Sequence, residues 1–162
     1  MKKMDFFGVG PKIGMILIPW WFLTIGLSFV FDSFKFIAES STGLMLGGAI
    51  VLLFGLIFYF YSVRLLLHGL KESKLVTQGT FYLCQNPLYI SFVLFFIPAT
   101  ALLLNSWLVF TASLVGFVLV KLHISKEYQV LEEAFGDEYL KYRAETPEFF
   151  PFPVKKWIRK NR

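Results

Sequence analysis

Polar side chains stand at both ends of one apolar hairpin, where they could bind a cofactor at a membrane face. Gln85, Asn86 and Tyr89 lie at the start of one apolar block. The next block ends at His123 and Glu127, which are four residues apart and so share one face of a continuous helix. Because two membrane-crossing arms return the chain to the side it left, these groups are expected to meet. A carboxylate at that depth is costly unless it is paired or used, so Glu127 could hold a cationic ligand group.

These residue types suit the binding of a polar, partly cationic cofactor better than nucleophilic hydrolysis. Aromatic rings at Phe81, Tyr82 and Tyr89 could stack on a flat ring or face a cation. The sequence has no Ser-His-Asp set, no glycine-rich phosphate loop and no cluster of metal ligands. Its one cysteine, Cys84, is expected to be a small packing residue. A helix cap with interfacial polar residues would have a similar composition, so the residues alone leave both interpretations open.

The composition is that of an integral membrane protein. The chain has 162 residues, of which 56% are hydrophobic, 20 are Phe and only 17% are charged. Soluble domains carry about 25% charged residues, and one of this size could not bury so much apolar surface. The net charge of +5 could indicate nucleic acid, but most basic residues flank apolar blocks, so no nucleic-acid partner is expected. We therefore predict a single all-α membrane domain over residues 1–162.

Four apolar blocks predict a polytopic protein with four transmembrane helices, over residues 13–31, 43–63, 87–104 and 107–124. Pro87 suits the first position of the third helix, where its missing N–H costs nothing. Pro98 is expected to kink the same helix. Residues 125–162 are expected to form a C-terminal region with amphipathic helices, because apolar side chains recur there at helical spacing.

Small residues in the second block predict close helix packing. Gly43 and Gly47 are four residues apart, and Gly48 and Gly55 follow. At such positions helix backbones can approach closely in lipid.

The distribution of basic residues predicts the topology. With four spans, all of the 16 Lys and Arg residues except Lys35 lie on one side. Since cytoplasmic loops carry the excess of positive charge, both termini, the 64–86 connection and Glu127 are expected in the cytoplasm. The expected location is the inner or plasma membrane.

Two motifs and the interval between them carry a resemblance to a known family. The first motif reads Leu75-Val76-Thr77-x-Gly79-x-Phe81, followed by Asn86-Pro87-x-Tyr89. The second reads Glu127, Leu131, Phe135-Gly136, Tyr139 and Tyr142. In this order and spacing, the second half of the chain resembles the isoprenylcysteine carboxyl methyltransferases and their relatives among phospholipid N-methyltransferases.

The resemblance implies an enzyme in the membrane that uses S-adenosyl-L-methionine to methylate a lipidic or amphipathic acceptor, through a carboxylate, a thiol or an amine. It implies a cofactor site made of Ser73, Lys74, Leu75, Val76, Phe81, Asn86, Pro87, Leu88, Tyr89 and Glu127. It also implies that His123 and Glu127 lie beside the reacting groups. The acceptor and the oligomeric state do not follow from it.

The chain departs from the family pattern at four positions: Gln85 and His123 replace arginines, Tyr128 replaces a second glutamate, and Phe81 replaces a tyrosine. Two other functions therefore remain open. One is an inactive membrane scaffold of the same fold, which the lost charges at 85 and 128 would suit. The other is a nicotinamide-dependent membrane reductase, for which the 64–86 connection offers Lys71 and Lys74 to bind phosphates.

Overall fold

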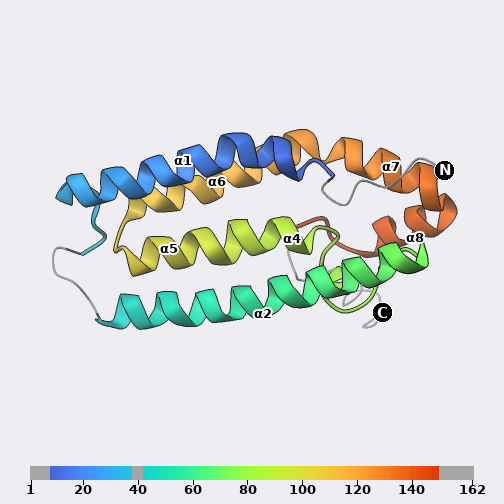
Figure 1. The fold of residues 1–162 in the computed structure, drawn as a ribbon, viewed down its shortest axis with the longest axis horizontal. Coiled ribbons are helices and arrows are strands. Elements are labelled where there is room, and N and C mark those ends of the chain that lie inside the picture. The colour runs from blue at the N-terminus through green and yellow to red at the C-terminus, as the bar shows by residue number, and fades with distance from the viewer. Residues whose placement is uncertain (1–7, 38–41, 150–162) are drawn as a thin grey trace, which may run out of the picture.

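The computed structural model describes residues 8–37 and 42–149, which fold as helices joined by short turns (Figure 1). In chain order the helices are α1 (Gly10–Val30), η1 (Asp32–Phe34), α2 (Thr42–Glu72), α3 (Thr80–Leu83), α4 (Pro87–Ile90), η2 (Ser91–Phe96), α5 (Ile97–Leu103), α6 (Trp107–His123), α7 (Ser125–Phe135) and α8 (Asp137–Glu145). Apart from an isolated bridge between Lys35 and Ser106, the described residues form no β-structure. The predicted all-α class is confirmed for this part of the chain.

The apolar hairpin forms the middle of the molecule, between the two long helices (Figure 1). Its first arm runs through α4, η2 and α5, and its second arm is α6. The helix α1 packs along α6, while α2 packs along η2 and α5. The arms meet through side chains such as Ile97 and Val109, both fully buried. The start of the first arm and the end of the second therefore lie at the same end of the bundle (Figure 1).

Two helices are long and apolar enough to cross a membrane: α1 with 21 residues and α2 with 31. At about 1.5 Å per residue they are roughly 31 and 46 Å long. The pair α6 and α7 qualifies only when taken together, and it bends by 44°. The first hairpin arm is a shorter apolar helix, Pro87–Leu103. The spans predicted at 13–31 and 43–63 thus coincide with helices of sufficient length, and those at 87–104 and 107–124 stay predictions.

Two of the four glycines predicted to allow close packing of α2, Gly48 and Gly55, make such contacts. A Cβ on Gly48 would lie 2.9 Å from Leu103 Cγ, and one on Gly55 would lie 2.5 Å from Phe95 Cβ. A Cβ on Gly47 would have nothing within 4 Å, so the packing role predicted there is wrong. The reason is helical phase, because residues seven apart are separated by about two full turns and face the hairpin together.

Prolines shape the first hairpin arm at its start and in its middle. Pro87 is the first residue of α4, as predicted, and its side chain is buried. Ser91–Phe96 forms a π-helical segment just before Pro98. A proline inside a helix lacks an N–H and presses on the carbonyl group one turn earlier, and a wider turn relieves both effects. The disturbance expected from Pro98 is thus present as a change of helix type.

Candidate functional site

The two ends of the hairpin meet at Tyr89 and Glu127. Tyr89 lies on α4, and Glu127 lies in the first turn of α7, beyond the end of α6. The Tyr89 hydroxyl donates a hydrogen bond to Glu127 Oε2 at 3.0 Å. The return of the chain through the hairpin therefore brings together two side chains that are 38 residues apart in sequence. We refer to them as the Tyr89–Glu127 pair.

The beginning of α1 covers the carboxylate of this pair. The backbone N–H of Val9 donates a hydrogen bond to Glu127. Gly8 passes so close that a Cβ there would lie 2.8 Å from Glu127 Oε2, and its φ of +46° is in the left-handed region. Both the close approach and the backbone conformation favour glycine at this position. Gly8 and Val9 thus pack closely against the Glu127 carboxylate.

The carboxylate of Glu127 has only neutral partners among the described residues, namely the Tyr89 hydroxyl and the Val9 N–H. Burial raises the pKa of the Glu127 carboxyl above its ordinary value of 4.5, and the two hydrogen bonds oppose this rise only in part. An opposite charge nearby would favour the ionised form. The local chemistry therefore suits a cationic group.

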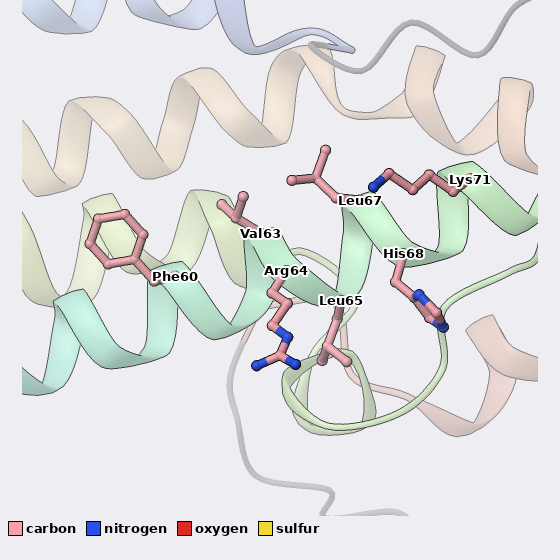
Figure 2. A pocket seen from close by; sticks show the side chains of 7 residues that line it. All are labelled: Phe60, Val63, Arg64, Leu65, Leu67, His68 and Lys71. Atoms are coloured by element: carbon pink, nitrogen blue, oxygen red, sulfur yellow. The ribbon is translucent and has the colours of Figure 1, made fainter.

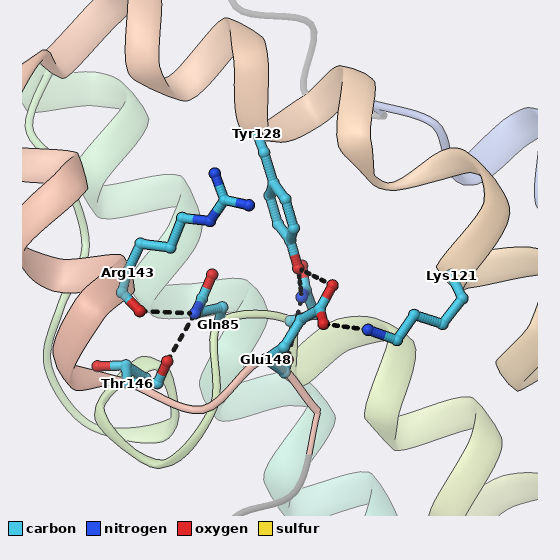
Figure 3. A network of polar contacts seen from close by, with 7 residues as sticks. Gln85, Lys121, Tyr128, Arg143, Thr146 and Glu148 are labelled. Atoms are coloured by element: carbon cyan, nitrogen blue, oxygen red, sulfur yellow. Dashed lines mark hydrogen bonds and ion pairs between the residues drawn. The ribbon is translucent and has the colours of Figure 1, made fainter. Parts of the chain in front are cut away.

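Asn86 belongs to a second polar cluster, which the C-terminal segment completes (Figure 3). Its Nδ2 donates to Tyr128 Oη at 2.6 Å and to the Glu148 carbonyl oxygen at 3.0 Å. The Tyr128 hydroxyl donates in turn to Glu148 Oε1 at 3.0 Å, and Lys121 forms an ion pair with the same carboxylate. We call these four residues the Asn86 cluster. Both amide hydrogens of Asn86 are thus engaged by the chain itself.

Gln85 holds the C-terminal segment from the other side (Figure 3). Its Nε2 donates to the carbonyl oxygens of Thr146 at 2.6 Å and Arg143 at 3.3 Å. The Arg143 guanidinium lies over the Tyr128 ring, 4.9 Å from the centroid. Two departures from the family pattern, at 85 and 128, thus contact the same segment. A glutamate in place of Tyr128 would set a second carboxylate against Glu148, so the aromatic residue removes a repulsion.

Two buried polar atoms near the Asn86 cluster have no hydrogen-bond partner in the described chain: Tyr139 Oη and Gln85 Oε1. Tyr139 is 1% exposed, and its ring centroid lies 6.4 Å from that of Tyr128. Burial raises the pKa of Tyr139 to about 12, so the hydroxyl remains protonated at neutral pH and can donate. Buried polar groups without partners are rare in folded proteins. Within the described residues, both atoms therefore stay unsatisfied.

The loop predicted to surround the cofactor lies against α2. Ser73 and Lys74 are exposed, and the Lys74 ammonium pairs with Glu72 at 2.8 Å. Leu75 packs against the hydrophobic core, and the side chain of Val76 fills the space over a glycine of α2. In the described part of the chain, no hydrogen bond or ion pair joins this loop to the Tyr89–Glu127 pair or to the Asn86 cluster. Its role as a cofactor loop stays a prediction.

The other predicted cofactor residues are part of the packing around α4. Phe81 is 9% exposed, and its carbonyl oxygen accepts a hydrogen bond from Tyr142 Oη at 2.7 Å. Pro87 is buried and Leu88 is partly exposed. Cys84 is 0% exposed and burial raises the pKa of its thiol to about 12, which agrees with a packing role. These residues thus belong to the packing in and around the Asn86 to Tyr89 turn.

His123 and Glu127 do not share one continuous helix face. The chain bends by 44° between α6 and α7, at Ile124, whose side chain is 2% exposed and is anchored in the core. His123 Nδ1 makes a hydrogen bond to the Leu119 carbonyl oxygen at 2.9 Å. Because a carbonyl can only accept, Nδ1 is the donor of this hydrogen bond. No hydrogen bond or ion pair between His123 and Glu127 is present in the described structure.

The sequence motifs did not identify several residues that complete the site. Glu148 completes the Asn86 cluster, and Gly8 and Val9 cover Glu127. Neither segment carries a periodic pattern, and Glu148 follows a proline in a stretch without regular structure. The only available signal was the lone glutamate between Pro147 and Phe149, which is too common to predict a contact 62 residues away.

Comparison with known proteins identifies the family of the chain. A family model described as phospholipid methyltransferase matches residues 44–138. No curated protein matches the chain. The matched region covers more than half of the 162 residues and includes both Tyr89 and Glu127. Gly8, which covers Glu127, and Glu148, which completes the Asn86 cluster, lie outside it. The chain therefore belongs to the phospholipid methyltransferase family.

Proposed function

We propose that the protein is a membrane-embedded methyltransferase that uses S-adenosyl-L-methionine and methylates a lipidic or amphipathic acceptor. The observation that carries this proposal is the Tyr89–Glu127 pair, in which a half-buried carboxylate has only neutral partners among the described residues. It lies where the apolar hairpin ends, so a water-soluble cofactor and a lipid-soluble acceptor can reach it from different sides. Family membership supports the same reaction class.

The residues present fit the cofactor by charge and by hydrogen-bonding capacity. Glu127 would hold its positively charged amino group, and Tyr89 would keep the carboxylate in place. Tyr139 Oη and Gln85 Oε1, which lack partners, would bond to its polar atoms. When bound, S-adenosyl-L-methionine supplies a methyl group already activated on a sulfonium. The protein then has to align the acceptor and exclude water, and correct positioning supplies most of the acceleration in such reactions.

The surroundings of the pair favour an amine as the acceptor over a carboxylate. Lys121 is paired with Glu148, and His123 stands where related enzymes have an arginine, so neither of these two residues offers a free guanidinium fork to bind a carboxylate. An ammonium acceptor must lose a proton before it can be methylated. Nε2 of His123, whose Nδ1 is bound to the Leu119 carbonyl oxygen, is our candidate to accept it, since Glu127 would be occupied by the cofactor.

Binding of S-adenosylhomocysteine to the purified protein, measured by calorimetry, tests the proposal. We expect saturable binding that Glu127→Gln weakens at least about tenfold, or about 1.4 kcal/mol. The matched control is Glu132→Gln, which makes the same change at an exposed position of α7 and should leave binding unchanged. Thermal unfolding of each variant verifies that it is folded.

The outcomes separate the alternatives. No binding by well-folded protein would favour an inactive scaffold, since Glu148 already fills part of the Asn86 cluster. Binding of a reduced nicotinamide cofactor instead would favour a reductase, although Lys74 is engaged by Glu72. Equal weakening by both glutamate variants would refute the role of Glu127 while keeping the methyltransferase.

We also propose a multi-pass topology with both termini in the cytoplasm. Cys84 is fully buried, so an introduced cysteine can be labelled without background from the native one. We expect Lys35→Cys to react with an impermeant maleimide in intact cells. Lys141→Cys should react only after permeabilisation. The reverse pattern would place the Tyr89–Glu127 pair on the other side of the membrane.

A further inference from the structure

On the outer face of α2, one row of residues along the helix changes from apolar to basic. Small buried residues recur every seven positions, at Gly48, Gly55, Ser62 and Gly69. Two positions after each of them stand Ile50, Ile57, Arg64 and Lys71. Two residues rotate the helix by about 200°, so this second series lies opposite the packed face. Ile50 and Ile57 are 55% and 60% exposed.

A groove on this face gathers three basic side chains beside four apolar ones (Figure 2). Its volume is about 520 Å³, and Arg64, His68 and Lys71 line it together with the apolar residues Phe60, Val63, Leu65 and Leu67. Arg64 and His68 point to the same side of α2, while the Lys71 side chain runs back along the helix toward Leu67 (Figure 2). The volume is within the range of small-molecule pockets, roughly 300–1,000 Å³.

The two permanent cations of the groove have no acidic partner in the described part of the chain. The nearest acid in sequence is Glu72, whose carboxylate is bound by Lys74 at 2.8 Å and by His68 at 3.0 Å. Arg64 and Lys71 therefore keep their full charge for an external anion. A guanidinium is well suited to phosphate, which accepts several charged hydrogen bonds at once, and an ammonium two turns further along the same helix adds a second positive charge.

The position of the groove along α2 points to the source of that phosphate. Residues 42–63 carry no charge and rise about 33 Å, close to the thickness of the hydrocarbon core. Arg64 is thus the first charged residue beyond the core, and Lys71 lies about 10 Å further out. Exposed apolar side chains continue inward from the groove at Phe60 and Ile57. This surface has the layout of a lipid, with an acyl-chain track below an anion site.

We propose that the outer face of α2 binds the phosphate of an anionic glycerophospholipid at Arg64 and Lys71, with an acyl chain along Phe60 and Ile57. The face is turned away from the one that packs on η2 and α5, so the bound lipid is an additional ligand and not the methyl acceptor. The inference does not depend on the proposed reaction.

Native mass spectrometry of the full chain, released from detergent with added lipid, tests this inference. The probes are phosphatidylglycerol and phosphatidylcholine of equal acyl composition. We expect retained phosphatidylglycerol adducts that the double change Arg64→Gln and Lys71→Gln weakens roughly tenfold, since each basic group at a lipid surface contributes about 1 kcal/mol. The matched control, Lys126→Gln with Lys141→Gln, removes the same charge from exposed positions elsewhere.

Several results would overturn the inference. Equal loss in the two double variants would show that only net charge matters. Equal retention of phosphatidylcholine would show that the anionic headgroup is not recognised. Displacement of the lipid by an equal concentration of inorganic phosphate would show that the acyl chain does not contribute to binding. Lys71→Gln alone provides a milder variant, and it should give a smaller loss in the same direction if Arg64→Gln impairs folding.

Discussion

The affinity for S-adenosylhomocysteine should depend on pH through Glu127. Burial raises the pKa of this carboxyl, so part of the ligand-free protein carries a proton there above pH 4.5. The cationic amino group of the ligand favours the ionised carboxylate and therefore displaces that proton. The perturbation that isolates this effect is Glu127→Gln, which keeps an acceptor for the Tyr89 hydroxyl but cannot ionise.

The size of the effect follows from the two states of the carboxyl. A hydrogen bond to a charged partner contributes about 1.5–3 kcal/mol, so Glu127→Gln should weaken binding roughly 10- to 150-fold where Glu127 is ionised. Below the raised pKa, binding must also release a proton, and the dissociation constant of the wild type should rise by up to about tenfold for each pH unit. Affinity therefore increases as pH rises through the pKa of Glu127 and is constant above it.

Calorimetric titrations between about pH 5 and pH 7 measure this dependence, in a range where the amino-acid groups of the ligand keep their charge. The ratio of the wild-type and Glu127→Gln affinities should grow with pH and then become constant. Glu132→Gln, at an exposed position of α7, should follow the wild-type curve. A ratio that stays the same over the whole range would refute the reasoning, because it would mean that Glu127 does not change protonation on binding.

The packing and the polar clusters give further predictions. Gly55→Ala should lower the melting temperature strongly, because its Cβ would lie 2.5 Å from that of Phe95. Gly47→Ala, with open space around it, should be nearly neutral. Equal effects of the two changes would contradict the proposed contact face. Tyr128→Phe should destabilise the protein by about 1–3 kcal/mol in chemical unfolding, because the Asn86 amide loses a buried acceptor. Without ligand, the wild type should lose stability as pH rises from 4.5 through the raised pKa of Glu127, since the folded state holds that proton more tightly than the unfolded state. An equal slope of stability against pH in Glu127→Gln would contradict this.

The sequence alone determined the helical class and the meeting of the hairpin ends. Long apolar blocks without charge can satisfy their backbone groups in a membrane only as helices. Two arms of similar length joined by a tight turn at Asn105 must return the chain to its starting side, so Tyr89 and Glu127 had to come close. Pro87 marked the beginning of the first arm for a local reason, its missing N–H. These inferences rest on composition, length and nearest-neighbour chemistry.

The tertiary structure decided what surrounds that meeting point. Gly8 and Val9 cover Glu127, and Glu148 completes the Asn86 cluster. These contacts join segments that are far apart in sequence and carry no periodic pattern, so no local rule could place them. The bend at Ile124 likewise separated His123 from the helix face of Glu127, because the burial of one side chain outweighed a continuous helical phase. Sequence periodicity fixes which face of a helix is apolar, whereas the partner of a polar side chain depends on how the whole chain packs.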